Sequence, residues 1–220
     1  MNLALFDLDN TLLAGDSDYN WSLFLIREGL LDAQTHHDRN EQFYADYKNG
    51  SLDIVEFLKF QLIPLSQHSK KFLDKLHLKY MQEVIRPMMT VKAQNLVDKH
   101  KAAGDVCMVI TATNSFVTKP IATAYGIENL IGSDPEMVNG EYTGGVSGTP
   151  SFQAGKVTRI NAWLAERGKK LSDFEKSYFY SDSFNDLALM KLVTNPVAVN
   201  ADDILKAYAE ENAWPQISLR

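Results

Sequence analysis

The sequence has little cysteine, no excess of proline or glycine, and fewer basic than acidic residues. Its 220 residues include one cysteine, seven prolines and twelve glycines. A lone cysteine excludes an internal disulfide framework, and a chain of this length buries enough apolar surface to fold without one. The ordinary glycine and proline content, with 45% hydrophobic residues, excludes collagen-like chains and argues against extensive disorder. We therefore expect one domain, or one domain with a smaller insert.

Positive charge and long apolar runs are also scarce. Lys and Arg total 22 against 28 Asp and Glu, for a formal charge of −6, which disfavours attraction to nucleic acid. The apolar run Leu3–Phe6 has no basic leader and meets Asp7 before it reaches the length of a signal-peptide core or a membrane span. Cys107 lies in an apolar run typical of a core strand. These features predict a cytoplasmic protein with no nucleic-acid partner and no membrane association.

Short apolar runs alternate with segments of helical spacing through much of the chain. The runs typical of buried strands are Leu3–Phe6, Val106–Ile110, Tyr178–Tyr180 and Val197–Val199. Helices are predicted after Pro87 up to Gly104, from Phe116 to Tyr125, from Lys156 to Arg167 and from Asp186 to Leu192. The pair Asn139-Gly140 predicts a hairpin. This alternation predicts an α/β fold with a doubly wound parallel sheet.

The long interval between the first two predicted strands is helical in pattern. Helices are expected around Trp21 up to Gly29, over Ala33–Tyr47, over Leu52–Leu62 and over Ser69–Val84, with Pro64-Leu65-Ser66 separating the last two. We therefore predict a helical subdomain over residues 15–85, inserted into a core domain of residues 1–14 and 86–220. Trp21, Phe24 and Leu25 are predicted to form its core. The adjacent pair His36-His37 is expected on the surface, because neighbouring residues on a helix face different ways.

Polar residues follow three of the predicted strands, where open α/β sheets bind their ligands. Asp7 and Asp9 follow the first strand, Thr111 ends the second, and Asp182 and Asp186 follow the third. Carboxylates held close together repel one another unless a proton or a cation intervenes. A hard divalent ion with oxygen ligands resolves that repulsion, and we infer Mg²⁺.

These motifs, in this order, resemble those of the haloacid dehalogenase-like hydrolases. The resemblance is to subfamily IB, the branch with a helical cap after the first motif, which includes the phosphoserine phosphatases, and it covers essentially the whole chain. Asp7-Leu8-Asp9-Asn10-Thr11 matches the first motif, Asp-x-Asp-x-Thr. Thr111 matches the second motif, Lys156 the third, and Asp182 with Asn185 and Asp186 the fourth. Four motifs in the family's order are far more specific than any one of them.

The resemblance implies phosphoryl transfer through an aspartyl phosphate. Asp7 would attack phosphorus, and Asp9 would protonate the leaving alcohol and then activate water. The groups expected to bind phosphate are Thr111, Ala112, Lys156 and Asn185. The groups expected to hold Mg²⁺ are Asp7, the Asp9 carbonyl, Asp182 and Asp186. Each residue also has a structural interpretation: the acids as turn or helix-cap residues, Thr111 as a strand-end hydroxyl, and Lys156 as a surface lysine.

The residues expected to recognise the substrate depart from the phosphoserine phosphatase pattern. That pattern has a Glu soon after the first motif for the ammonium group, and a cap arginine for the carboxylate. Asp16 occupies the first place, and Lys59 is the nearest cation to the second. Asp16 still suits an amine, so an amino-alcohol phosphate such as histidinol phosphate is an alternative to phosphoserine. Asp16 could equally cap the helix through Trp21.

The sequence therefore predicts a Mg²⁺-dependent phosphomonoesterase acting on a small soluble phosphate ester. Two alternatives stay open. One is a phosphotransferase that uses the same intermediate with another acceptor, and the other is a catalytically idle metabolite-binding module. A dehalogenase is disfavoured, because Asp9 and Asp182 would have no task without a metal and a phosphate. The sequence leaves the oligomeric state open.

Overall fold

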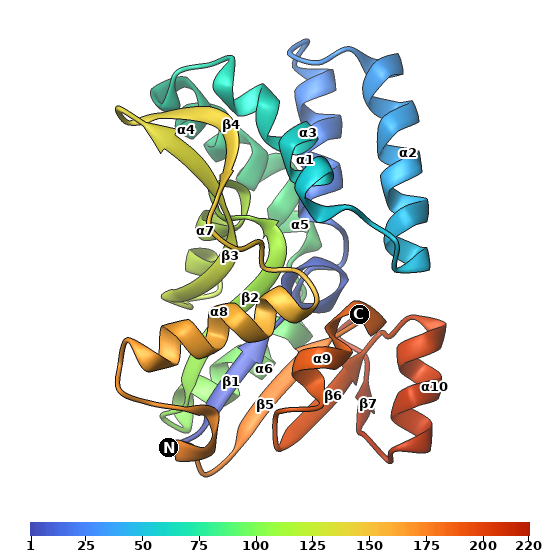
Figure 1. Cartoon of the computed structure of the whole chain (residues 1–220), viewed down its shortest axis with the longest axis vertical. Coiled ribbons are helices and arrows are strands. Elements are labelled where there is room, and N and C mark those ends of the chain that lie inside the picture. The colour runs from blue at the N-terminus through green and yellow to red at the C-terminus, as the bar shows by residue number, and fades with distance from the viewer.

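A seven-stranded sheet forms the centre of the protein (Figure 1). The computed structural model describes residues 1–220. The strand order is β4-β3-β2-β1-β5-β6-β7, and all neighbours are parallel except β3 and β4. The strands are β1 (Leu3–Phe6), β2 (Val106–Asn114), β3 (Asn129–Val138), β4 (Glu141–Ser147), β5 (Ser177–Ser181), β6 (Asn195–Val199) and β7 (Gln216–Ile217). The predicted α/β fold is confirmed, and the predicted hairpin at Asn139-Gly140 adds the antiparallel edge strand.

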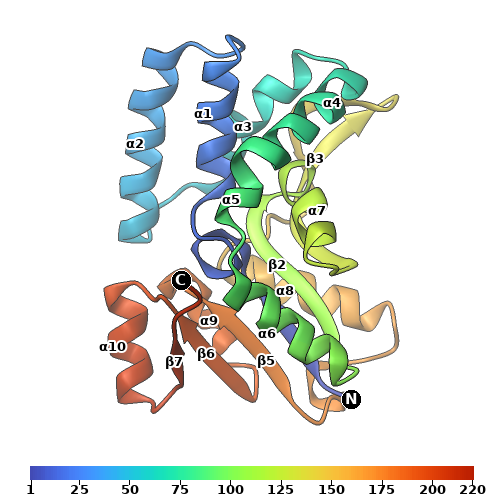
Figure 2. The same ribbon diagram turned by 180° about the vertical axis from the view of Figure 1, so that it is seen from behind.

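Helices cover both faces of this sheet, as a doubly wound fold requires. One face packs against α6 (Val91–Ala102) and α7 (Ser115–Ala124), which lie in front in Figure 2. The other face packs against α8 (Ala154–Ala165), α9 (Leu187–Met190) and α10 (Asp203–Glu211). Strand β1 lies between β2 and β5, and its four residues are completely buried. Cys107 on β2 is buried as predicted.

The segment Ser17–Met88, called the helical insert below, lies over the carboxyl ends of the strands (Figure 1). Its helices are α1 (Ser17–Arg27), α2 (Ala33–Asn49), α3 (Ile54–Ser66), α4 (Lys70–Tyr80) and α5 (Arg86–Met88), with a wide turn over Met81–Ile85 joining the last two. Trp21, Phe24 and Leu25 are buried in it, which confirms that prediction. Their cluster is continuous with the α6 and α7 face of the sheet. No helix of the protein combines the length and apolarity needed to cross a bilayer.

The chain enters and leaves the helical insert through two segments that lie side by side. Leu13 and Met89 form an antiparallel bridge, and Ala14 N donates to Met88 O at 2.8 Å. The division of the chain into residues 15–85 and the remainder stays a prediction.

Two expectations about the helical insert are wrong. Helix α3 continues through Pro64 and ends at Ser66. Proline in a last turn removes only one hydrogen bond of the helix, and Pro64 is buried with Leu65 on the inner face. His36 is also buried, because α2 turns it onto Phe60 of α3, with ring centroids 4.5 Å apart, whereas His37 is exposed.

The start of α1 is held by a buried tyrosine of α4. Tyr80 is completely buried, and its hydroxyl donates to the backbone oxygen of Ser17 at 2.6 Å. Ser17 is itself completely buried. This bond therefore fixes the end of α1 that faces the sheet.

We expect Tyr80→Phe to lower the free energy of unfolding by about 1–3 kcal/mol, because the Ser17 carbonyl loses its partner out of reach of water. Urea denaturation followed by circular dichroism measures this change. Tyr44→Phe is the matched control, because Tyr44 is half exposed, at 51%, and its hydroxyl can bond to water. An equal effect of the two substitutions would contradict the assigned role of Tyr80.

Candidate active site

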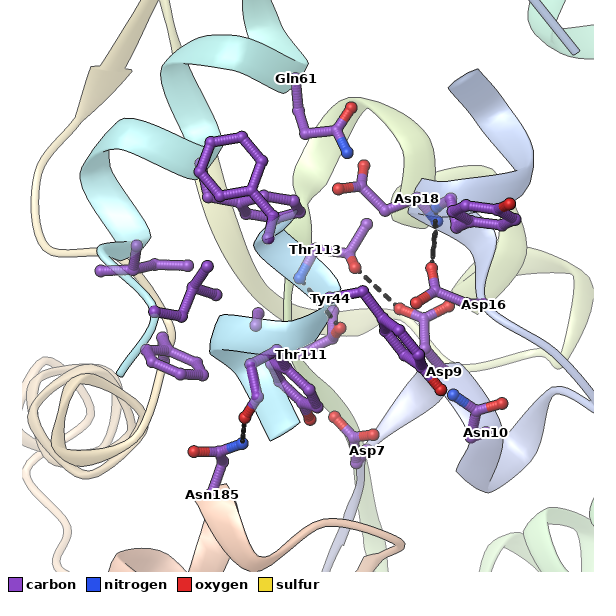
Figure 3. A pocket seen from close by; sticks show the side chains of 18 of the residues that line it. Asp7, Asp9, Asn10, Asp16, Asp18, Tyr44, Gln61, Thr111, Thr113 and Asn185 are labelled. Atoms are coloured by element: carbon purple, nitrogen blue, oxygen red, sulfur yellow. Dashed lines mark hydrogen bonds between the residues drawn. The ribbon is translucent and has the colours of Figure 1, made fainter. Parts of the chain in front are cut away.

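A cavity of about 450 Å³ lies between the carboxyl ends of the strands and the helical insert (Figure 3). The predicted site residues that line it are Asp7, Asp9, Asp16, Thr111, Ala112, Lys156, Asp182, Asn185 and Asp186. The structure thus brings together every predicted site residue except Lys59. Lys59 is exposed on α3 and does not line the cavity. Gln61, two residues further along α3, lines it instead.

Lys156 lies between two carboxylates at the base of this cavity. Its Nζ is 2.8 Å from Asp7 Oδ1 and 2.7 Å from Asp186 Oδ1, and the lysine is only 3% exposed. Ser181 donates its hydroxyl to Asp186 at 2.6 Å. Gly155 permits this arrangement, because a Cβ there would lie 2.1 Å from the backbone oxygen of Pro150. The interpretation of Lys156 as a surface lysine is therefore excluded.

The pKa values of Asp7 and Lys156 are both raised in this arrangement. Burial raises the pKa of Asp7 to about 7, although Lys156 acts in the opposite direction. Burial alone would lower the pKa of Lys156, but Asp186 and Asp7 outweigh it and hold that pKa above its ordinary value. The lysine is therefore charged, and it is the only basic residue lining the cavity.

Asp182 adds a further carboxylate close to Asp7. Thr11 links the two, because its hydroxyl lies 2.9 Å from Asp182 Oδ1 and 3.3 Å from Asp7 Oδ2. Burial and the charge of Asp7 raise the pKa of Asp182 well above its usual range. Lys156 is bound to Asp7 and Asp186 but not to Asp182, so three carboxylates face one lysine and this end of the cavity has an excess of negative charge.

Asp9 is held by one group from the sheet and one from the helical insert. Its Oδ2 accepts a hydrogen bond from the Thr113 hydroxyl at 2.7 Å, and its Oδ1 accepts one from Ser17 N at 2.5 Å. Burial and the neighbouring Asp16 raise the pKa of Asp9 to about 6. A carboxyl group with a pKa in this range can donate a proton and take one back near neutral pH.

Thr111 and Asn185, two further predicted phosphate ligands, differ in whether their hydrogen-bonding groups are already engaged within the protein. Thr111 accepts a bond from Thr113 N at 3.2 Å, and its own hydroxyl proton is left available to a ligand. The side chain of Asn185 is committed: Gln153 donates to its Oδ1 at 2.8 Å, and its Nδ2 donates to Tyr47 O at 3.2 Å. Asn185 makes no hydrogen bond to Lys156, and its side chain links Gln153, just before α8, to Tyr47 of α2.

Asp16 fits both of its predicted interpretations. Its Oδ1 accepts hydrogen bonds from Asp18 N and Tyr19 N, each at 2.9 Å, so it caps α1. It also lines the cavity. Burial raises the pKa of Asp16, against the two backbone bonds.

Several residues of the cavity were not predicted from the sequence. Thr113 could have been predicted, because it lies two residues after Thr111 at the end of the same strand and side chains two apart on a strand share a face. Asp18 could not, since an acid in the first turn of a helix is commonplace. The aromatic lining from the helical insert and the loop before α8 was also missed: it comprises Tyr19, Phe43, Tyr44, Tyr47, Phe57 and Phe152.

Comparison with known proteins accounts for this constellation. The model of the haloacid dehalogenase-like hydrolases matches residues 4–191. The chain belongs to this family. The resemblance read from the motifs is thereby confirmed, and the protein is an enzyme of a hydrolase family.

Similar proteins include named phosphatases. The hydrolase is 49% identical over 220 residues to histidinol-phosphatase of Neisseria meningitidis serogroup C (strain 8013), with 100% of this chain and 99% of the relative covered. It is 29% identical to phosphoserine phosphatase SerB1 of Mycobacterium tuberculosis (strain ATCC 25618 / H37Rv), with 96% of this chain and 68% of the relative covered.

Solved structures show the same fold. A protein of unknown function from Bordetella pertussis Tohama I has a TM-score of 0.94 and 48% identity, with 100% of this chain and 99% of that chain covered. A phosphoserine phosphatase solved as a phospho-aspartyl intermediate analogue has a TM-score of 0.67, with 99% and 93% covered. Its identity is 19%, so it supports the fold alone.

The raised pKa of Asp7 predicts how stability depends on pH in the metal-free protein. A carboxyl group whose pKa rises on folding, here from 3.8 to about 7, stabilises the fold below its unfolded pKa and loses that contribution as the pH rises through its folded pKa. Between these two pKa values, 3.8 and about 7, the free energy of unfolding of the parent, relative to that of Asp7→Asn, should therefore fall by about 1.4 kcal/mol for each unit by which the pH rises.

Urea denaturation of both proteins in the presence of a chelator, at several pH values, measures this difference. The Asp7→Asn variant is the reference, because its amide does not titrate and the rest of its sequence is the same. A difference between the two proteins that does not vary with pH would contradict the assigned burial of Asp7.

Proposed function

We propose that this hydrolase is a Mg²⁺-dependent phosphomonoesterase acting on a small cationic amino-alcohol phosphate, with histidinol phosphate as the leading candidate. The observation that carries the proposal is the charge of the cavity. Its lining contains seven acidic residues, Asp7, Asp9, Asp16, Asp18, Glu41, Asp182 and Asp186, and one basic residue, Lys156. A phosphate fits near Lys156, and only a cationic group fits the acidic wall formed by the helical insert.

This charge distribution argues against phosphoserine. Both phosphoserine and histidinol phosphate carry an amine, but phosphoserine also carries a carboxylate. Lys156 is already bound to Asp7 and Asp186, and Lys59 is outside the cavity. The carboxylate of phosphoserine would therefore enter an acidic cavity without a counter-charge. The similarity to the Neisseria histidinol-phosphatase supports the same choice.

The donor set fits a magnesium ion. Every candidate ligand is an oxygen, and three carboxylates compete for one lysine, so a divalent cation would relieve their repulsion. The side chains alone make no cage of three or more metal ligands. This agrees with Mg²⁺, which is typically bound through one or two carboxylates together with substrate phosphate. Asp7, the Asp9 carbonyl and Asp182 would hold the ion, with Asp186 orienting its water.

The chain's own residues can then be assigned to the two half-reactions. Bound Mg²⁺ would neutralise charge on the phosphoryl oxygens. A carboxylate oxygen of Asp7 attacks phosphorus, the bond from phosphorus to the alcohol oxygen breaks, and Asp9 gives that oxygen its proton. Water then loses a proton to Asp9 and attacks phosphorus, which frees Asp7 and releases phosphate. Thr111 and Lys156 hold the phosphoryl oxygens in both steps.

The direct test measures phosphate release from histidinol phosphate and from phosphoserine, with Mg²⁺ and with a chelator. We expect kcat/KM to be at least about tenfold higher for histidinol phosphate, because only phosphoserine brings an uncompensated carboxylate. Asp7→Asn should release no phosphate, since an amide is not a nucleophile. Equal or better hydrolysis of phosphoserine would overturn the substrate assignment, and release that does not depend on the metal would overturn the magnesium site.

The same assay separates hydrolysis from its alternatives. Water as the acceptor gives equal amounts of alcohol and inorganic phosphate. Alcohol in excess over phosphate, in the presence of a sugar or a second alcohol, would identify a phosphotransferase. No turnover of any phosphate ester would identify the idle metabolite-binding module.

Asp9→Asn should separate the two half-reactions. The leaving group of p-nitrophenyl phosphate needs little protonation, so the aspartyl phosphate should form and then persist because water is not activated. Rapid mixing should show a burst of nitrophenol approaching one per site, followed by slow turnover, while an alkyl phosphate gives neither. Absence of a burst from the folded variant would mean that Asp9 positions Asp7 or the metal rather than transferring protons.

A further inference from the structure

Asp18 is a buried carboxylate on the wall of the cavity that the reaction does not use. It is 3% exposed and lines the cavity from the first turn of α1. Its Oδ1 accepts a hydrogen bond from Asn114 Nδ2 at 3.1 Å. Its Oδ2 is buried and has no partner. A carboxylate oxygen that is removed from water without a partner is costly. Because Asp18 lines the substrate cavity, a bound ligand can supply that partner.

The acids along this wall follow one another in order of distance from the reaction centre. Figure 3 shows Asp7, Asp9, Asp16 and Asp18 in succession. Each acid raises the pKa of a neighbour: Asp9 raises that of Asp7, and Asp16 raises that of Asp9. Burial, together with the charges of Asp16 and Asp9, raises the pKa of Asp18 well above its usual range. Asp16 is therefore the acid beside the reacting groups, and Asp18 is the acid at the remote end.

The cavity also has aromatic walls. Phe43, Tyr44 and Phe57 line it from the helical insert. Phe43 and Phe57 contact each other edge to face, with centroids 5.3 Å apart. Aromatic walls favour an aromatic ring packed against them, and a buried carboxyl group beside that ring favours an N–H donor.

The order of acids matches the order of nitrogens in a heterocyclic amino-alcohol phosphate. In such a molecule the amine is on the carbon next to the phosphorylated one, and the ring lies further away. Building on the proposed function, we propose that Asp18 is a specificity-determining residue that accepts a hydrogen bond from a ring N–H at the end of the substrate remote from the phosphate. Asp16 then receives the amine.

Asp18→Asn is a suitable variant, because the new amide keeps an oxygen for Asn114 and replaces only the unpartnered Oδ2 with a donor. Two substrates of equal length isolate the ring: histidinol phosphate and 2-amino-3-phenylpropyl phosphate, which has the same amine but no ring nitrogen. We expect Asp18→Asn to lower kcat/KM for histidinol phosphate about tenfold to a hundredfold, as loss of a charged hydrogen bond does. Hydrolysis of the phenyl compound should change less than about threefold.

Asp16→Asn is the matched control. It changes the neighbouring acid, and asparagine still caps α1. Because both substrates carry the amine, this variant should lower kcat/KM for both by a similar factor. Equal losses on both substrates in Asp18→Asn, or no loss on either, would overturn the assignment of Asp18 to the ring.

Hydrolysis of p-nitrophenyl phosphate distinguishes failure of this inference from failure of the proposed function. If the parent hydrolyses it with Mg²⁺ and Asp18→Asn does not discriminate between the two ring substrates, only the assignment of Asp18 falls. If the parent hydrolyses no phosphate ester, the proposed function falls. Calorimetric binding of histidinol to the parent and to Asp18→Asn then decides the inference: tighter binding to the parent supports it, and equal binding overturns it.

Discussion

The ion pairs of Lys156 are the interaction on which the rest of the site depends. The proposed attack on phosphorus requires Asp7 to be ionised, yet burial raises the pKa of Asp7 to about 7. Lys156 opposes that effect from 2.8 Å away, and its own charge is sustained by Asp7 and Asp186 together. Removing one partner of such a buried set typically costs about 3–5 kcal/mol, because the remaining charge has no compensation. The fold supplies this geometry by placing β1 beside β5 and packing the first turn of α8 closely through Gly155.

The position of Asp9 also depends on the helical insert. Asp9 belongs to the turn after β1, but one of its oxygens is held by Ser17 N, the first residue of α1. The same helix terminus carries Asp16 and Asp18, and Tyr80 fixes it from α4. A tilt of α1 would therefore alter the acid and the substrate-facing carboxylates together. In this arrangement the orientation of Asp9 is coupled to α1, the element proposed to contact the remote end of the substrate.

Much of this could be predicted from local sequence, and the misses share one cause. Completely buried strands such as β1 leave short apolar runs, and glycine marks several helix ends, so the α/β fold and the three strand ends were predictable. Pro64, His36 and Lys59 were misjudged because their environment depends on how α2 and α3 pack. On α3, Leu58, Gln61, Leu62 and Leu65 form the buried face, and Lys59 points about a quarter-turn away from Leu58. Asp18 could not be recognised from its neighbours in the sequence, because its burial and its bond to Asn114 arise only when α1 packs against the end of β2.

The uneven charge of the cavity has a consequence for how any substrate is oriented. The phosphate end offers Lys156, Thr111 and oxygen ligands suited to a divalent cation, whereas the wall formed by the start of α1 offers Asp16 and, further from the reacting groups, Asp18. A phosphate dianion against that wall would face two carboxylates without a cation, and an amine at the base would compete with Lys156. Both misplacements are repulsive, so a molecule with its phosphate and its basic nitrogens at opposite ends fits in only one direction. The acids at the start of α1 would therefore act on the proposed substrate twice, by attracting its cationic end and by excluding its phosphate from the wrong end of the cavity.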